Sequence, residues 1–187
     1  MKQQIFLVRH GETEWSKAGK HTGRTDVALT EEGVVRAKEL GTLLAGVKGH
    51  VFMSPLGRAR ETCRLAGFTG EVDDDLREWD YGVYEGRTTA EIRMEDPGWS
   101  VWLSPIRGGE ALDDVAGRAR AVIGRVNSLE GDVLLFAHGH ILRILAACWI
   151  GQPPVVGRYL ALDTASVSTL GYERQTRVIR NWNRTAP

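Results

Sequence analysis

Two histidine-containing clusters and one separate arginine carry the side chains that could do chemistry in this sequence. Arg9 and His10 follow one short apolar run, His138 and His140 follow another, and Arg58 comes shortly after a third. An arginine suits phosphate because its planar fork makes two parallel charge-assisted hydrogen bonds. A histidine can act as a nucleophile or proton carrier near neutral pH. If the fold brings these groups together, they predict a site for a dianion.

The elements that would position these residues can be read from the apolar runs. Residues 4–8, 51–53 and 133–137 are short, apolar and β-prone, which predicts buried strands, with 4–8 the central one. Helical spacing follows each run, over 31–44, 58–65 and 141–150, and Thr30 stands where an N-cap would. Strands that alternate with helices predict an α/β fold with a largely parallel sheet. Ligands bind beyond the carboxyl ends of such strands, where the clusters fall.

The remaining segments give weaker signals. Residues 89–95 and 111–129 predict two further helices, the second after the break at Gly108 and Gly109. Residues 73–77 are charged and expected to be exposed, and 79–86 form an ordered loop with aromatic residues. Near the end, 159–162, 166–172 and 177–182 show the alternation that suits a closing pair of strands. We find no internal repeat and no inter-domain linker.

Composition narrows the function classes. The 187 residues include 24 Lys plus Arg, 24 Asp plus Glu and two Cys, so the formal net charge is zero. This balance argues against a protein that holds nucleic acid or an anionic membrane by bulk charge, so any anion site must be local. Cys63 and Cys148 indicate no disulfide framework. The early apolar run at residues 5–8 is too short for a signal peptide or membrane span, and we expect a cytoplasmic protein.

Six ordered motifs resemble one known family. They are 7–13 (LVRHGET), 21–23 (HTG), 29–33 (LTEEG), 54–59 (SPLGRA), 76–82 (LREWDYG) and 137–140 (AHGH). They are similar to the histidine phosphatase superfamily, in the branch that contains the cofactor-dependent phosphoglycerate mutases. Fungal sedoheptulose-bisphosphatase-like members and small actinobacterial acid phosphatases are especially similar. The resemblance implies an α/β three-layer sandwich, phosphoglycerate-mutase-like, as a single domain over 1–187 with a short helical cap at about 85–110.

The resemblance also implies roles for the core residues. His10 would be the nucleophile that forms a phosphohistidine, while Arg9, Arg58 and His138 would hold the phosphoryl oxygens. A neutral imidazole offers its lone pair only if an acceptor holds its other nitrogen as N–H, and nearby cations should keep His10 unprotonated. We expect His138 to act as a charged donor. Glu78 would protonate the leaving oxygen, with partial desolvation from the adjacent aromatic residues.

The resemblance gives weaker support for further binding residues. Ser16, Thr22, Gly23 and Gly139 would contact phosphate or substrate. Transfer through a loose transition state is chiefly positioning and charge stabilisation, so we expect neither a metal nor another cofactor.

The role of several residues allows a second interpretation. His140 could belong to a His-Gly-His metal site, but no third ligand is suitably spaced, so a supporting or cap role is the better interpretation. His21 and His50 are expected to be exposed and without a catalytic role. Arg60 and Arg64 lie close enough to Arg58 to be confused with it.

The short stretch between Glu78 and Glu110, about thirty residues, bears on the reaction. The phosphoglycerate mutases carry a long basic insertion there, and a short cap should admit water to the phosphohistidine. We therefore expect a phosphomonoesterase that hydrolyses a small phosphorylated metabolite such as a sugar phosphate. A phosphoglycerate mutase and a non-catalytic phospho-ligand binder remain alternatives. Specificity is expected in residues 85–106 and at Arg158, and a homodimer is possible.

Overall fold

The central strand β1 (Ile5–Arg9) is an apolar run buried between two neighbours, as its composition predicts. The computed structural model describes residues 3–186. The other strands are β2 (Gly49–Met53), β3 (Glu71–Val72), β4 (Asp132–Ala137), β5 (Val167–Glu173) and β6 (Thr176–Arg184). They form one six-stranded sheet in the order β3-β2-β4-β1-β5-β6. The first four pair in parallel, while β5 runs antiparallel to β1 and to β6. The prediction of a largely parallel sheet is confirmed.

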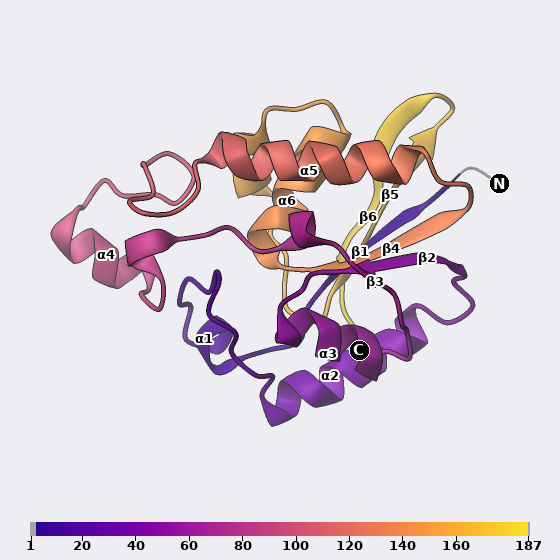
Figure 1. Cartoon of the computed structure of the whole chain (residues 1–187), viewed down its shortest axis with the longest axis horizontal. Coiled ribbons are helices and arrows are strands. Elements are labelled where there is room, and N and C mark those ends of the chain that lie inside the picture. The colour runs from indigo at the N-terminus through magenta and orange to yellow at the C-terminus, as the bar shows by residue number, and fades with distance from the viewer. Residues whose placement is uncertain (1–2, 187) are drawn as a thin grey trace.

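Helices cover both faces of this sheet. They are α1 (Glu14–Lys17), α2 (Glu31–Leu43), α3 (Gly57–Leu65), α4 (Thr89–Glu95), α5 (Leu112–Asn127) and α6 (Gly139–Trp149). Three 3-10 helices are η1 (Asp74–Leu76), η2 (Gly82–Tyr84) and η3 (Pro154–Tyr159). Helices α2 and α3 lie on one face and α5 and α6 on the other, which gives the expected three layers (Figure 1).

Local capping explains where several helices begin. The Thr30 hydroxyl accepts a hydrogen bond from the N–H of Gly33 at 2.9 Å, so α2 starts after the predicted N-cap. A reciprocal capping box between Thr88 and Glu91 starts α4. The one-turn helix α1 was not predicted, because only four residues make it and its capping partner is Ser16. These caps fix the loops that lead toward the carboxyl edge of the sheet.

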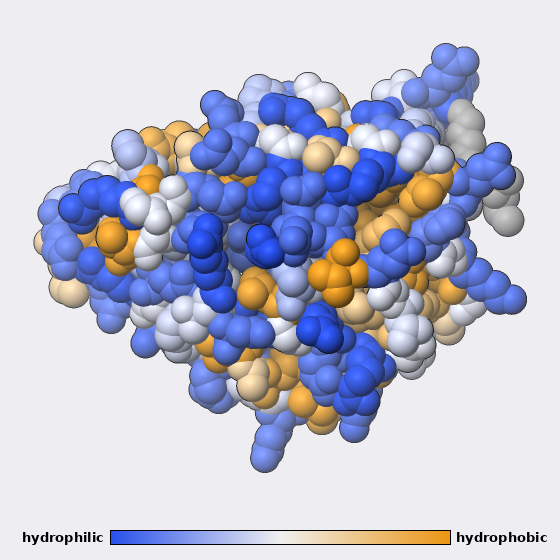
Figure 2. All heavy atoms as spheres, in the orientation of Figure 1, coloured by the Kyte–Doolittle hydropathy of each residue, from blue (hydrophilic) through white to orange (hydrophobic). Residues whose placement is uncertain are grey.

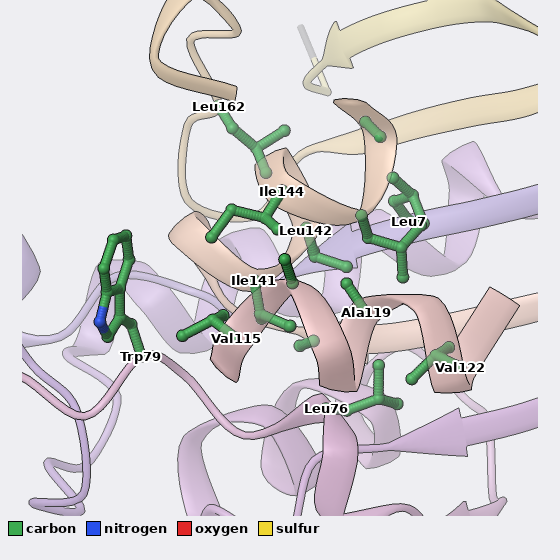
Figure 3. Close-up of a cluster of buried hydrophobic side chains, with 14 of the residues drawn as sticks. Leu7, Leu76, Trp79, Val115, Ala119, Val122, Ile141, Leu142, Ile144 and Leu162 are labelled. Atoms are coloured by element: carbon green, nitrogen blue, oxygen red, sulfur yellow. The ribbon is translucent and has the colours of Figure 1, made fainter. Parts of the chain in front are cut away.

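The core is divided by the sheet into two clusters. Successive residues of a strand point to opposite faces, so Leu7 packs with the α5 and α6 side and Val8 with the α2 and α3 side. Figure 3 shows the first cluster, in which side chains of α5 and α6 interdigitate between the sheet and Trp79. Each fully buried side chain of this kind stabilises the fold by about 1.5–3 kcal/mol. This packing gives the catalytic edge a rigid base.

The predicted closing pair of strands is confirmed as β5 and β6, but not every segment that shows the alternation belongs to it. Residues 159–162 form no strand, because η3 reaches Tyr159 and the following residues run irregularly to Leu162. Pro153 and Pro154 start that 3-10 turn, since proline fixes its own φ and donates no hydrogen bond. The segment 73–77 is also less exposed than its charge suggests, because Leu76 in η1 is fully buried.

The cap, here residues 85–110, projects beyond the carboxyl edge of the sheet and includes α4 (Figure 1). It is tied to the loop after α1 by backbone hydrogen bonds in both directions between His21 and the cap. The His21 N–H donates to Arg87 and the Gly86 N–H donates to His21, each at 2.9 Å. An isolated bridge between Lys20 and Thr88 continues the pairing. The single-domain organisation over 1–187 stays a prediction.

Candidate active site

The carboxyl ends of β1 and β4 place two of the predicted residues side by side. His10 follows β1 and His138 follows β4, and their ring centroids lie 5.1 Å apart. A cavity of about 180 Å³ opens at this edge. It is lined by Arg9, His10, Ser16, Gly19, Lys20, His21, Thr22, Glu78, Tyr81, Gly139, His140, Arg143 and Leu162.

His10 is set up as a neutral nucleophile. Its side chain is buried, and its Nδ1 lies 2.7 Å from the carbonyl oxygen of Gly11. A carbonyl only accepts, so Nδ1 carries the proton and Nε2 keeps the lone pair. Burial, with the positive charges of Arg9 and Arg58, lowers the pKa of His10 well below 6.5. The ring is therefore neutral at pH 7, as its surroundings predict.

Arg9 presents a partly unused guanidinium to the cavity. Its Nη1 donates to the carbonyl of Leu162, whereas its Nε is shielded from solvent and has no partner among residues 3–186. Burial lowers the pKa of Arg9 and the carboxylate of Glu78 opposes that shift. A shielded donor without a partner is costly unless a ligand accepts from it. Arg9 is thus suited to hold an anion.

Arg58 and His138 lie behind the cavity wall rather than along it. Arg58 is 1% exposed, and its guanidinium donates to the carbonyls of Thr22, Gly23 and Thr25 at 2.9–3.1 Å. Its Nε donates to Nδ1 of His138 at 3.2 Å. In this arrangement the guanidinium holds the loop after Lys20, which is a different set of partners from the expected phosphoryl oxygens. Arg60 and Arg64 are exposed, so Arg58 is the arginine of α3 at this site.

The expectation that His138 is a charged donor is wrong for this arrangement. Burial, reinforced by Arg58 and then by His10, lowers its pKa well below 6.5. Because Nδ1 accepts from Arg58, the proton of the neutral ring is on Nε2, which lies 2.7 Å from the Ser54 hydroxyl. His138 is a neutral, fully engaged side chain that packs against His10.

Glu78 lines the cavity and is held by the backbone. Its carboxylate oxygens accept hydrogen bonds from the N–H groups of Trp79, His140 and Ile141, each at 3.0 Å. The last two belong to the first turn of α6, whose unpaired N–H groups and dipole favour an acceptor there. The side chain is 7% exposed. This fixes the carboxylate at the same cavity as His10 and Arg9.

The softer predictions fall in different places. Ser16 and Thr22 line the cavity, and the Ser16 hydroxyl is already bonded to the backbone of Thr13. Gly139 lies at the start of α6 beside the guanidinium of Arg9. Gly23 is not among the lining residues, and its N–H donates to Glu85 at 3.0 Å. The loop at Gly23 therefore joins Arg58 to the cap.

One histidine differs from its sequence prediction, while His50 is exposed as predicted. His21 was expected to be exposed, but it is 9% exposed, lines the cavity and has its Nε2 3.2 Å from the Thr89 hydroxyl. Burial lowers its pKa to about 4. His140 also lines the cavity, and its Nδ1 lies 2.7 Å from the Tyr81 hydroxyl.

The tautomer of His140 follows from its surroundings. Burial first, then the Arg143 charge, lowers the pKa of His140 well below 6.5, and burial raises that of Tyr81 well above 10. The phenol therefore donates to Nδ1, and the His140 proton is on Nε2.

Sequence reasoning missed Arg143 and Lys20, which both line the cavity. The signal for Arg143 was present, because it is the one charged residue within the apolar helix pattern of 141–150. Arg158, which was expected to contribute to specificity, is exposed and stacks on Tyr159 outside the cavity. Arg143 reaches the cavity because α6 is oriented by packing between distant segments, which no local pattern reveals.

Residues 3–186 contain neither a group of metal ligands nor a membrane-spanning helix. No group of three His, Cys, Asp or Glu side chains in that range is placed to hold a metal ion. Within the same range, no helix has both the length and the apolar character needed to span a bilayer.

Comparisons with known proteins agree with this geometry. An acid phosphatase of Mycobacterium tuberculosis is 39% identical over 180 residues, covering 93% of this chain and 89% of that protein. A sedoheptulose 1,7-bisphosphatase of Saccharomyces cerevisiae is 38% identical over 184 residues, covering 79% and 68%. A solved structure of an open reading frame product from Mycobacterium tuberculosis superposes with a TM-score of 0.95 at 38% identity, covering 99% of both chains. The family model of the histidine phosphatase superfamily (branch 1) matches residues 5–185, and this chain belongs to that family.

Proposed function

We propose that this protein is a phosphomonoesterase that hydrolyses a small phosphorylated metabolite, such as a sugar phosphate, through a phosphohistidine at His10. The observation that carries this proposal is the state of His10. Its Nδ1–H is held by the Gly11 carbonyl, so the Nε2 lone pair is available at a cavity that also contains Arg9 and Glu78. The names of its relatives, an acid phosphatase and a sugar bisphosphatase, support hydrolysis of phosphate esters in general.

Each step of the reaction has a group to perform it. The Nε2 lone pair attacks phosphorus, the N–P bond forms, and the bond between phosphorus and the ester oxygen breaks. Glu78 in its protonated form supplies the proton that the leaving alkoxide needs and becomes a carboxylate. Water then attacks the phosphohistidine while Glu78 takes its proton, and the products are inorganic phosphate and free His10. Arg9, which lines the cavity, stabilises the charge on the transferring group through its guanidinium.

The short cap favours hydrolysis over return of the phosphoryl group to a substrate. The cap spans residues 85–110, and its one α-helix is the seven-residue α4. A cap of this size leaves the edge of the cavity open to water. A phosphoglycerate mutase remains the second candidate, and it would require 2,3-bisphosphoglycerate and isomerise its substrate without releasing phosphate.

A phosphate-release screen tests the proposal. Purified protein is assayed on a panel of phosphorylated metabolites and on p-nitrophenyl phosphate, each with and without EDTA and with and without 2,3-bisphosphoglycerate. We expect substrate-dependent phosphate release that needs no bisphosphoglycerate and survives EDTA. Isomerisation without release would make the protein a mutase. Ligand binding without turnover on every ester would make it a non-catalytic binder.

Trapping the intermediate tests the chemistry directly. Acid-labile, base-stable label from a ³²P-phosphate ester should appear on His10 after rapid quenching. The His10→Ala variant should show no label and no turnover, while its thermal melting confirms that it folds. Label on another side chain, or turnover within tenfold of wild type in the variant, would contradict the mechanism.

A further inference from the structure

One arginine outside the cavity uses every donor that it has. Arg118 on α5 donates from Nε and Nη2 to the two carboxylate oxygens of Glu110, each at 2.8 Å. Its Nη1 donates to the carbonyls of Asp75 and Arg77 at 2.8 Å, and its Nη2 also donates to that of Glu78 at 3.4 Å. These five bonds equal the five N–H donors of a guanidinium. All three carbonyls belong to the segment that leads to Glu78, so Arg118 holds the backbone of that segment.

We propose that Arg118 and Glu110 form a positioning pair for Glu78, which fixes its carboxyl group where it can protonate the leaving oxygen. Neither residue of the pair lines the cavity, so both act through Glu78 and not on the substrate. This inference rests on the proposed function, because it concerns the acid step of that reaction. A proton donor must be held close to the atom that it protonates, and a displacement of about 1 Å can cost about a hundredfold in rate.

The guanidinium of Arg118 reaches the Glu78 carboxylate through a single peptide unit. Arg118 holds the carbonyl end of the peptide bond between Glu78 and Trp79. The N–H at the other end of that planar unit donates to Oε1 of Glu78 at 3.0 Å. If the carbonyl turned away from Arg118, the N–H would turn away from the carboxylate with it. One of the three N–H groups that hold the carboxylate therefore depends on the guanidinium.

Glu110 fixes the chain on the other side of Glu78. Its Oε2 accepts from the Asp80 N–H, and its own N–H donates to the Asp80 carbonyl, both at 3.0 Å. The Glu110 carbonyl accepts from the indole Nε1 of Trp79 at 2.9 Å. The two segments lie so close together that a Cβ at Gly109 would overlap the carbonyl oxygen of Asp80. Three consecutive residues, beginning with Glu78, are thus each bonded to this pair.

The helix that carries Arg118 is itself held by packing. Val115, Ala119 and Val122 of α5 are buried in the core (Figure 3), while the chain from η1 passes beside the helix (Figure 1). The surface over α5 and this segment is mostly hydrophilic (Figure 2), yet only 18% of the Arg118 side chain and 23% of the Glu110 side chain are exposed. A bidentate pair with this little exposure keeps its geometry better than an exposed ion pair does.

A second arginine of α5 distinguishes positioning from simple attachment. Arg125 also ties the helix to the segment before Glu78, through bonds to the carboxylates of Asp73 and Asp75 at 2.7–2.8 Å. Those bonds go to side chains near the start of the segment, whereas Arg118 holds its backbone up to Glu78 itself. If attachment of the segment were all that mattered, the loss of either arginine would have the same effect on the reaction.

The dependence on the leaving group tests the proposal. We compare kcat/KM for p-nitrophenyl phosphate, whose phenolate needs little protonation, with that for the alkyl phosphate that the wild type hydrolyses fastest. Arg118→Gln should lower the value for the alkyl ester about tenfold or more beyond any loss on p-nitrophenyl phosphate. Arg118→Lys should lose less, because an ammonium keeps the charge and some of the bonds. Arg125→Gln is the matched control and should keep the wild-type ratio between the two esters.

A double variant shows whether Arg118 acts through Glu78. In the Glu78→Gln background the acid is already absent, so adding Arg118→Gln should lower kcat/KM for the alkyl ester by less than about threefold. A loss by the same factor in both backgrounds would mean that Arg118 acts by another route, and it would overturn the proposal.

Glu110→Gln provides the test if Arg118→Gln does not fold. The amide can still accept from the Asp80 N–H, but it no longer offers Arg118 two anionic acceptors. We expect the alkyl ester to lose about threefold or more in kcat/KM relative to p-nitrophenyl phosphate, and thermal melting checks the fold. An unchanged ratio in the folded variant would contradict the role given to the pair.

The readouts separate this inference from the proposed function. Phosphate release by the wild type and a phosphohistidine at His10 report on the function, whereas the ratio between the esters reports on the positioning pair. If the wild type hydrolyses its esters but folded Arg118→Gln lowers both rates by the same factor, the pair is only structural and the proposed function stands. If the wild type hydrolyses no ester, the proposed function fails and this inference fails with it.

Discussion

Arg58 donates a hydrogen bond from Nε to Nδ1 of His138 at 3.2 Å, so two of the three residues expected to hold the phosphoryl oxygens are bonded to each other. This contact fixes the proton of His138 on Nε2, where the Ser54 hydroxyl meets it at 2.7 Å. The pair forms a buried support behind His10, and Arg58 also holds the loop that contains Thr22. The site is therefore built in two layers, with Arg9, His10 and Glu78 at the cavity itself.

Replacing Arg58 with Lys should damage both stability and activity. An ammonium cannot reach the carbonyls of Thr22, Gly23 and Thr25 together with His138, so buried acceptors lose their donors. We expect the free energy of unfolding to fall by about 2–4 kcal/mol and kcat/KM by at least tenfold. Urea titration and p-nitrophenyl phosphate kinetics measure the two effects. The matched control is Arg60→Lys, an exposed change on the same helix, which should alter stability by less than about 0.5 kcal/mol. A fully stable Arg58→Lys would refute the role given to this network.

The pH dependence of turnover should follow the lowered pKa of His10. Burial and the adjacent arginines keep the ring neutral, so the nucleophile is present at pH 7 and stays present as the pH falls through 6.5. It is lost only when the pH falls through the lowered value. We expect the acid limb of kcat/KM for p-nitrophenyl phosphate that belongs to His10 to lie clearly below pH 6.5, because kcat/KM reports the pKa values of the free enzyme. An acid limb centred at 6.5 or above would mean that the ring titrates like an ordinary histidine.

Stability should fall in acid partly because of His21. The pKa of His21 is about 4 in the folded chain, whereas the ordinary value is 6.5. As the pH falls, His21 therefore binds a proton in the unfolded chain before it does so in the folded chain. The contribution of neutral His21 is complete above pH 6.5 and is lost as the pH falls toward 4. The difference amounts to about 3 kcal/mol, at 1.36 kcal/mol per pKa unit.

Unfolding by urea at a series of pH values measures this contribution. His21→Gln, which cannot titrate, should lose less stability between pH 6.5 and 4 than the wild type does. His50→Gln changes an exposed histidine and should keep the wild-type pH dependence. If the free energy of unfolding changed with pH equally in wild type and His21→Gln, His21 would not contribute to the loss of stability in acid.

Replacing Glu78 with Gln should affect esters according to their leaving groups. An alkoxide needs a proton from Glu78, whereas p-nitrophenolate needs little help. The loss in kcat/KM should be at least tenfold larger for an alkyl phosphate than for p-nitrophenyl phosphate. Asp80→Asn is the control, because Asp80 is a buried neighbour that pairs with Arg24 and does not line the cavity. Equal losses on both esters would exclude the acid role.

Much of the fold could be predicted because its signals are local. The apolar run that becomes β1 and the capping threonine before α2 are visible in consecutive residues, and the structure has both. The segment 159–162 shows the limit of such signals. Alternation there is real, but Pro153 and Pro154 start a 3-10 turn, and the segment supplies carbonyls to Arg9 and Arg143 instead of to a sheet.

The sequence by itself determined which chemistry is available. Arg9 and His10 are consecutive residues at the end of a strand, so the backbone alone keeps them close together. Only the tertiary structure decided how those groups are used. Arg58 and His138 are 80 residues apart in the sequence, and their contact with each other depends on partners contributed by distant loops. The neutral state of the histidines likewise depends on burial, which is a property of packing between distant segments rather than of residue order.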